Sequence, residues 1–231
     1  MNNLSHTFDD AWNRFQTLDT LRLVEETLES EWRRGRSEYL AFLVPIEDTD
    51  AKRHIAATIA RIVDIPGVKP YRESYWHITV KGAGFRMEQP TQPDEISAET
   101  ATAIAAASDR AFAFESEFTV SLGPVNALDG VVCFEVIGRG HVARLNDLLT
   151  RAAPEMPQHA VDRLFLPHIS IAHFTSSEGL GQLKSTLADI RNDHTEGPTF
   201  PVQRIDLILA RLSQSGPDFE PIASYPLRPT N

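Results

Sequence analysis

The chain has 231 residues, of which 42% are hydrophobic and 23% are charged. These values are typical of one large globular domain or of two close lobes, and they exclude disordered, collagen-like and disulfide-dense chains. The 32 Asp and Glu residues outnumber the 22 Lys and Arg residues, and the formal net charge of −10 disfavours long-range attraction to nucleic acid or to an anionic membrane.

The first 36 residues have the pattern of an amphipathic helix. Large apolar residues recur at steps of three or four, which is the repeat of one helix face. They are Trp12, Phe15, Leu18, Leu21, Val24, Leu28 and Trp32. We therefore predict an N-terminal helical extension over residues 1–36, packed on a single main domain over residues 37–231.

A strand–helix–strand unit follows this extension. Residues 39–46 form an apolar run typical of a strand, and residues 49–64 have helical periodicity. The breaker Pro66-Gly67 ends the helix, and residues 75–81 alternate as a second strand.

A helix and a strand precede a second unit of the same kind. Residues 95–110 are Ala-rich and predict a helix, and residues 118–122 predict a strand that ends at Gly123-Pro124. The second unit has a strand at 131–137, a helix at 141–153 and a strand at 165–174. The remaining elements are a helix at 177–190, a strand at 203–212 and an edge strand at 219–227.

The two strand–helix–strand units match each other in register. Superposing His77 on His168 sets an offset of 168 − 77 = 91 residues, which places strand on strand, helix on helix and Pro66 on Pro157 without a gap. We infer a duplication. It predicts an α+β fold with two β-α-β lobes related by a pseudo-twofold axis.

The tripeptides His77-Ile78-Thr79 and His168-Ile169-Ser170 occupy matching positions of the two units. Residues two apart in a strand point to the same face, so each histidine and its hydroxyl partner project together. If the strands are adjacent, two imidazoles and two hydroxyls converge on one cleft. That set suits displacement at phosphorus, with one histidine as base, the other as acid, and the hydroxyls on the non-bridging oxygens. Which histidine is the base stays open.

Other reactive residues favour structural roles. His173 has the opposite parity to His168, so we expect it on the far face of its strand. Cys133 lies in an apolar run typical of a packed, reduced thiol. Neither motif has the ligand spacing of a zinc site, so no metal or other cofactor is expected. The remaining histidines predict surface residues: His6, His54, His141, His159 and His194.

Two segments carry paired signatures: Trp76-His77-Ile78-Thr79-Val80-Lys81 and Leu166-Pro167-His168-Ile169-Ser170-Ile171-Ala172. They resemble the motifs of the 2H phosphoesterase superfamily, in particular its 2′-5′ RNA ligase-like branch. The tail from Asp206 to Arg211, with Gly216 and Tyr225-Pro226-Leu227, is similar to the closing hairpin of that branch. The resemblance covers about residues 37–227. Two departures are Gly82-Ala83, where bulky apolar residues are usual, and His173, where the second motif often ends with Arg.

The resemblance implies a bilobal fold with central antiparallel sheets and metal-independent hydrolysis of cyclic or 2′,5′ phosphodiesters. It implies His77 and His168 as the catalytic pair, with Thr79 and Ser170 as phosphate ligands. The expected reaction opens a nucleoside or RNA-terminal 2′,3′-cyclic phosphate to a 2′-phosphate. One alternative is a non-catalytic nucleotide-binding regulatory module on the same fold. Another is 2′-5′ RNA ligation, which the acidic composition disfavours.

Strand parity adds two candidate substrate contacts. Tyr75 and Lys81 share the face of His77, where Tyr75 could stack on a base or sugar and Lys81 could neutralise phosphate charge. A tyrosine at the edge of the core and a snorkelling lysine are the alternatives.

The expected partner is a small nucleotide or an RNA end, bound by a monomer. No apolar run approaches the ~20 residues of a membrane-spanning helix. Residues 1–15 have no signal-peptide apolar region, so we expect a cytoplasmic location.

Overall fold

The computed structural model describes residues 7–23, 32–128, 130–157, 165–193, 197–213 and 217–230. Its helices are α1 (Phe8–Thr17), α3 (Thr49–Ile62), α4 (Ala98–Phe112), α5 (Arg139–Ala152) and α6 (Leu180–Asn192), with a 3-10 turn η2 (Glu73–Tyr75). Its strands are β1 (Glu38–Pro45), β2 (Val68–Pro70), β3 (His77–Arg86), β4 (Glu95–Ile96), β5 (Phe118–Leu128), β6 (Val131–Ile137), β7 (His168–Phe174), β8 (Thr199–Val202), β9 (Arg204–Arg211) and β10 (Asp218–Pro226).

Within these described residues, ten strands form one sheet. Its order is β10-β9-β1-β3-β7-β6-β5-β8, with β2 beside β7 and β4 beside β3. The central strands β3 and β7 are antiparallel. The sheet has two halves that meet between β3 and β7. From this line outward, the strands of one half are β3, β1, β9 and β10, and they match β7, β6, β5 and β8 of the other half. The predicted α+β fold, with two duplicated lobes and antiparallel central strands, is confirmed.

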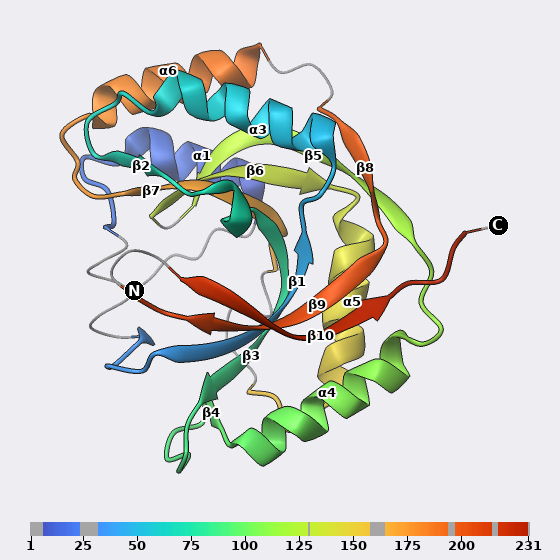
Figure 1. Cartoon of the computed structure of the whole chain (residues 1–231). Helices are drawn as coiled ribbons and strands as arrows, with labels where there is room; N and C mark the ends of the chain where they lie inside the picture. The colour runs from blue at the N-terminus through green and yellow to red at the C-terminus, as the bar shows by residue number, and fades with distance from the viewer. Residues whose placement is uncertain are drawn as a thin grey trace.

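The two repeated units are β1–α3–β3 and β6–α5–β7. Adding 91 to the bounds of α3 gives 140–153, which differs by one residue from the bounds of α5. Each helix packs against the other unit: α3 contacts β7 and α6, whereas α5 contacts β3 and α4. Figure 1 shows α3 and α6 together over the half that holds β7, and α4 and α5 together at the opposite end of the molecule. One continuous hydrophobic core joins the two halves.

Local sequence explains where α3 begins and ends. Asp48 caps its N-terminus by accepting a hydrogen bond from the Ala51 amide at 2.8 Å. Ile55 and Ile62 recur on one face and are fully buried against the sheet. Gly67 then adopts φ 82°, a left-handed conformation that glycine tolerates, and turns the chain into β2 beside β7.

The N-terminal prediction is wrong for residues 18–23 and for residues 33–36, where Arg34 and Gly35 have φ values of 46° and 76°. The helix ends at Thr17 because Leu18 is extended (φ −67°, ψ 138°), and the Leu21 amide donates to Ser177 Oγ at 2.8 Å. Phe15 and Leu21 are buried in the same cluster as the sheet, so tertiary contacts outweigh the helical pattern. Residues 1–6 and 24–31 lie outside the described residues. The division of the chain at residue 36 stays a prediction.

Several strands differ from the predicted elements. β2, β4 and β8 are too short to produce a periodic pattern, and β5 continues through Gly123-Pro124 by a register shift between Leu122 and Val125. Such a bulge accommodates Pro124, which has no amide to donate. β9 and β10 pair antiparallel with β10 at the edge, as predicted for the closing hairpin, although Gly216 lies outside the described residues. Of the helices described above, none is both long and apolar enough to cross a membrane.

Candidate active site

The two predicted motifs meet at the centre of the sheet. β3 begins with His77, β7 begins with His168, and the strands pair antiparallel through Ile78 and Ile169. Both isoleucines are 0% exposed, so they point into the core. The residues flanking each isoleucine therefore point to the opposite face of the sheet.

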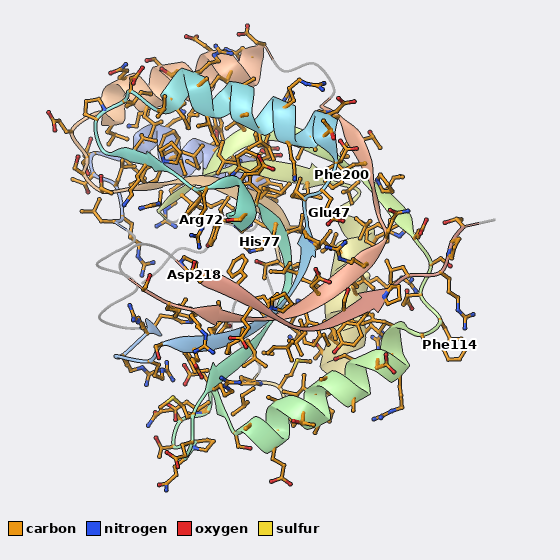
Figure 2. All side chains as sticks on the ribbon, viewed as in Figure 1. Glu47, Arg72, His77, Phe114, Phe200 and Asp218 are labelled. Carbon is orange, nitrogen blue, oxygen red and sulfur yellow. The ribbon has the colours of Figure 1, made fainter. Side chains whose placement is uncertain are left out.

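The antiparallel register assembles four polar side chains on that face. Extending it by one residue in each direction from the isoleucine pair places His77 opposite Ser170 and Thr79 opposite His168. The pseudo-twofold axis passes through the centre of this quartet. Figure 2 shows His77 at the junction between the two halves of the sheet. The structure thus brings together all four residues that the sequence pairs.

Both imidazoles are oriented in the same way. His77 Nδ1 lies 2.5 Å from the Tyr75 carbonyl oxygen, and His168 Nδ1 lies 2.7 Å from the Leu166 carbonyl oxygen. A carbonyl only accepts, so each Nδ1 carries the hydrogen and the Nε2 of the neutral ring presents a lone pair. His77 Nε2 lies 3.2 Å from Thr79 Oγ1. Each histidine is therefore held as the tautomer that a general base requires.

Burial makes both histidines harder to protonate. It is the main cause that lowers the pKa of His77 to about 4; the hydrogen bond to the Tyr75 carbonyl opposes this shift, and the charge of His168 adds to it. Burial also lowers the pKa of His168, against the hydrogen bond to Leu166. Because a charge on His168 acts on His77, the two rings are close enough to disfavour double protonation.

Each motif strand contains a β-bulge directly after its hydroxyl residue. The extra residue is Val80 in β3 and Ile171 in β7, and 80 + 91 = 171. Asn146 Nδ2 donates to the Val80 carbonyl at 2.7 Å, and the Tyr71 amide donates to the Ile171 carbonyl at 2.9 Å. These bonds satisfy the carbonyls of the extra residues and fix both bulges.

The bulge in β7 changes the face on which His173 lies. Cys133 pairs with Ser170, whereas its neighbour Val132 pairs with Ala172. Adjacent residues of β6 point to opposite faces of the sheet, and each residue of β7 shares the face of its β6 partner. The side chains of Ser170 and Ala172 therefore point to opposite faces, and His173 lies on the same face as Ser170. The prediction that His173 lies on the far face is wrong, because it assumed unbroken alternation.

The bulge in β3 moves Lys81 in the same way. Leu43 pairs with Thr79 and its neighbour Phe42 pairs with Lys81, so Lys81 lies on the face opposite Thr79. Lys81 is also only 2% exposed. The expectation that Lys81 shares the face of His77 is therefore wrong.

Aromatic rings surround His77. Tyr75 belongs to the turn η2 instead of the predicted strand, yet its ring lies edge-on to His77 at 5.1 Å between centroids. Phe219 of β10 contacts the same imidazole at 5.2 Å and stacks on Tyr75 at 5.3 Å. Tyr71 stacks on Tyr75 at 4.1 Å and contacts His173 at 4.9 Å. No sequence pattern indicates Phe219 or Tyr71, because neither belongs to a motif strand.

The two histidines have different neighbours across the sheet. Glu135 of β6 lies directly opposite His168, whereas Pro45 of β1 lies opposite His77. Glu135 Oε1 accepts a hydrogen bond from Arg191 Nη1 at 2.6 Å, which holds this carboxylate in place. His168 therefore has a polar neighbour, and His77 is enclosed by aromatic and aliphatic groups.

Other candidate residues take structural positions. Cys133 is a buried free thiol, as predicted, and burial raises its pKa. His141 is exposed, but His54 is half-buried against the Phe134 ring instead of lying on the surface. His6, His159 and His194 lie outside the described residues. Across the described ranges, no three His, Cys, Asp or Glu side chains gather as a metal site would require.

Comparison with known proteins gives both a family and a fold. The sequence model of the 2′-5′ RNA ligase superfamily matches residues 51–212. None of the curated proteins matches the chain. The protein TT0787 of Thermus thermophilus is similar in structure, with 18% identity, a TM-score of 0.61 and coverage of 84% of this chain and 100% of that chain. Escherichia coli LigT in its apo form has 16% identity, a TM-score of 0.59 and coverage of 84% and 99%. A LigT structure in complex with 3′-AMP has 17% identity, a TM-score of 0.59 and coverage of 83% and 98%.

Proposed function

We propose, since the chain belongs to the 2′-5′ RNA ligase superfamily, that it hydrolyses a cyclic or 2′,5′ phosphodiester. The favoured substrate is a nucleoside or RNA-terminal 2′,3′-cyclic phosphate, and the product is a 2′-phosphate. The observation that supports this proposal is the quartet of two imidazoles and two hydroxyls, assembled on one face around the Ile78–Ile169 pair. The 3′-AMP complex of LigT supports a nucleotide as the ligand class.

The quartet contains the groups that the reaction needs. One neutral imidazole accepts a proton at Nε2 from a water molecule, whose oxygen attacks the phosphorus in line with the 3′ oxygen. The protonated second imidazole gives its proton to the departing 3′ oxygen. Thr79 and Ser170 donate hydrogen bonds to the non-bridging oxygens, where negative charge accumulates. The proton count balances, because one histidine gains the proton that the other loses.

The lowered pKa of His77 suits the role of base. His77, with a pKa lowered to about 4, is neutral at pH 7 and ready to accept a proton. His168 lies opposite Glu135 in the register, but the Glu135 carboxylate is paired with Arg191, and burial lowers the pKa of His168 as well. The negative charge of an incoming phosphate raises the proton affinity of both rings, so that one of them can carry the single proton.

Tyr75 is proposed as a contact for the nucleoside. Its ring lies beside His77 and continues through Phe219, so a base or sugar next to the reacting phosphate would meet an aromatic wall. We also propose that the protein acts as a monomer on a small nucleotide or an RNA end.

A substrate panel with four site variants and one control variant tests the proposed reaction. Wild-type protein in EDTA is assayed on 2′,3′-cyclic, 3′,5′-cyclic and 2′-5′-linked substrates, with products separated by chromatography. His77→Ala and His168→Ala should each lower turnover of the 2′,3′-cyclic nucleotide by about 10²–10⁴-fold. Thr79→Ala and Ser170→Ala should cost about 1–3 kcal/mol, or ~5–150-fold. His141→Ala, an exposed histidine on α5, is the control and should match wild type.

The same panel separates the two alternatives. If wild-type protein binds a nucleotide but hydrolyses nothing, and the histidine variants change only affinity, a non-catalytic binding module is the better account. If 2′-5′ joining of RNA ends exceeds hydrolysis, the ligase direction is the better account.

A further inference from the structure

A lysine and a histidine form a cross-strand pair on the face of the quartet. Lys69 of β2 lies directly opposite His173 of β7 in the antiparallel register. Their neighbours Val68 and Phe174 pack into the core, so Lys69 and His173 point to the other face. That face also holds Ser170, because of the bulge in β7. Cβ atoms of such a pair lie about 4.5–5.5 Å apart, close enough for both side chains to contact one anion.

Lys69 differs from most of the cations around it. Arg72 pairs with Asp218, Lys52 pairs with Glu73, and Arg204 forms two hydrogen bonds with Glu47. Lys69 is exposed, and among the described residues no acidic side chain forms an ion pair with its ammonium group. In a chain of net charge −10, this is a local cation beside the candidate active site.

The Lys69–His173 pair lies next to the position of the reacting phosphate, which Ser170 would hold. Ser170 and His173 are separated by two ladder steps and the bulged residue, so roughly 7 Å lies between them along β7. This separation suits a second phosphate of the same ligand, next to the phosphate that Ser170 holds. The Tyr71 ring contacts the His173 ring at 4.9 Å between centroids.

We propose that Lys69 and His173 form a subsite for a second phosphate group. The inference rests on the proposed function and names its substrate class: a cyclic phosphate that carries a further phosphate, in preference to a nucleoside 2′,3′-cyclic phosphate. The second phosphate can be the phosphodiester that precedes the terminal nucleotide of an RNA, or a 5′-phosphate on a mononucleotide. A charge-assisted contact of this kind suits recognition of either group.

Three substrates test the subsite and distinguish its two sources. They are adenosine 2′,3′-cyclic phosphate, its 5′-phosphorylated form, and the dinucleotide ApA with a terminal 2′,3′-cyclic phosphate. Wild-type protein should have a kcat/KM about tenfold higher for at least one of the two larger substrates than for the first. Preference for the dinucleotide indicates an RNA end, and preference for the 5′-phosphate indicates a small nucleotide.

Variants assign the preference to the pair. Lys69→Met keeps the aliphatic stem and should abolish the preference, without changing kcat/KM for the one-phosphate substrate. Lys69→Arg should retain it. His173→Phe keeps the ring contact with Tyr71 and should reduce the preference severalfold. Arg53→Ala removes one exposed positive charge from α3 and should leave the preference unchanged, which excludes a general charge effect.

Product binding separates failure of the subsite from failure of the proposed function. Calorimetry compares adenosine 2′-phosphate with adenosine 2′,5′-bisphosphate. If wild type hydrolyses the cyclic nucleotide but prefers no larger substrate, and Lys69→Met alters neither kinetics nor binding, the subsite is refuted and the function stands. If nothing is hydrolysed but the bisphosphate binds more tightly only when Lys69 is present, the function fails and the subsite stands.

Discussion

The buried His77 should make the wild-type protein less stable at acid pH, and replacing His77 by Gln should remove this effect. The pKa of His77 is about 4 in the folded protein, against an ordinary value of 6.5. Between these values the unfolded chain binds more protons than the folded chain, so the free energy of unfolding falls as the pH falls. At pH 5 the difference of 6.5 − 5, at 1.36 kcal/mol per pH unit, is about 2 kcal/mol. Below pH 4 the loss levels off at about 3 kcal/mol, and above pH 6.5 it is absent.

Urea unfolding of wild type and His77→Gln at pH 7.5, 6.5 and 5 measures this difference directly. Wild type should lose about 2 kcal/mol relative to the variant between pH 6.5 and pH 5, since all other titrating groups are shared. The exposed His141, replaced by Gln in the same way, is the reference. A constant difference between wild type and His77→Gln across this range, or an NMR titration of His77 near pH 6.5, would refute the argument that burial keeps this base neutral.

Two further outcomes are expected. Turnover of a 2′,3′-cyclic nucleotide should persist after exhaustive chelation, because acid–base chemistry by two histidines needs no metal; loss with EDTA that zinc or manganese restores would overturn the mechanism. Asn146→Leu should lower the free energy of unfolding by about 1–3 kcal/mol, because it leaves the Val80 carbonyl buried without its donor. Urea unfolding measures that loss, and an unchanged midpoint would show that the bulge holds without Asn146.

The duplication was predictable because its signals are local. Each motif is a short alternating strand, and a constant offset relates the two units, so the sequence alone pairs His77 and Thr79 with His168 and Ser170. Their meeting at Ile78 and Ile169 follows from the pseudo-twofold symmetry. This part of the site depends on strand alternation and on symmetry, and both can be recognised from the sequence alone.

The positions beyond the bulges were not predictable from alternation. The extra residues Val80 and Ile171 are stabilised by donors from α5 and from the segment after β2, which no local pattern reveals. Each bulge reverses the faces of the residues that follow, and for this reason Lys81 and His173 were both misplaced. Phe219 was missed because β10 brings it to His77 from a distant part of the chain.

The exchange of helices between the two units has a consequence for how the protein can lose activity. Along the chain, α3 connects β1 to β3, but it packs against β7 of the other half. Likewise, α5 connects β6 to β7 but packs against β3. Cutting the chain between the units would separate β7 from α3 and β3 from α5, so each fragment would expose apolar surface that a helix of the other covers, and neither should fold alone. Two such fragments, mixed, should recover structure only as a complex. In the intact chain, heat or denaturant should therefore separate His77 from His168 in the same cooperative transition that unfolds the whole sheet.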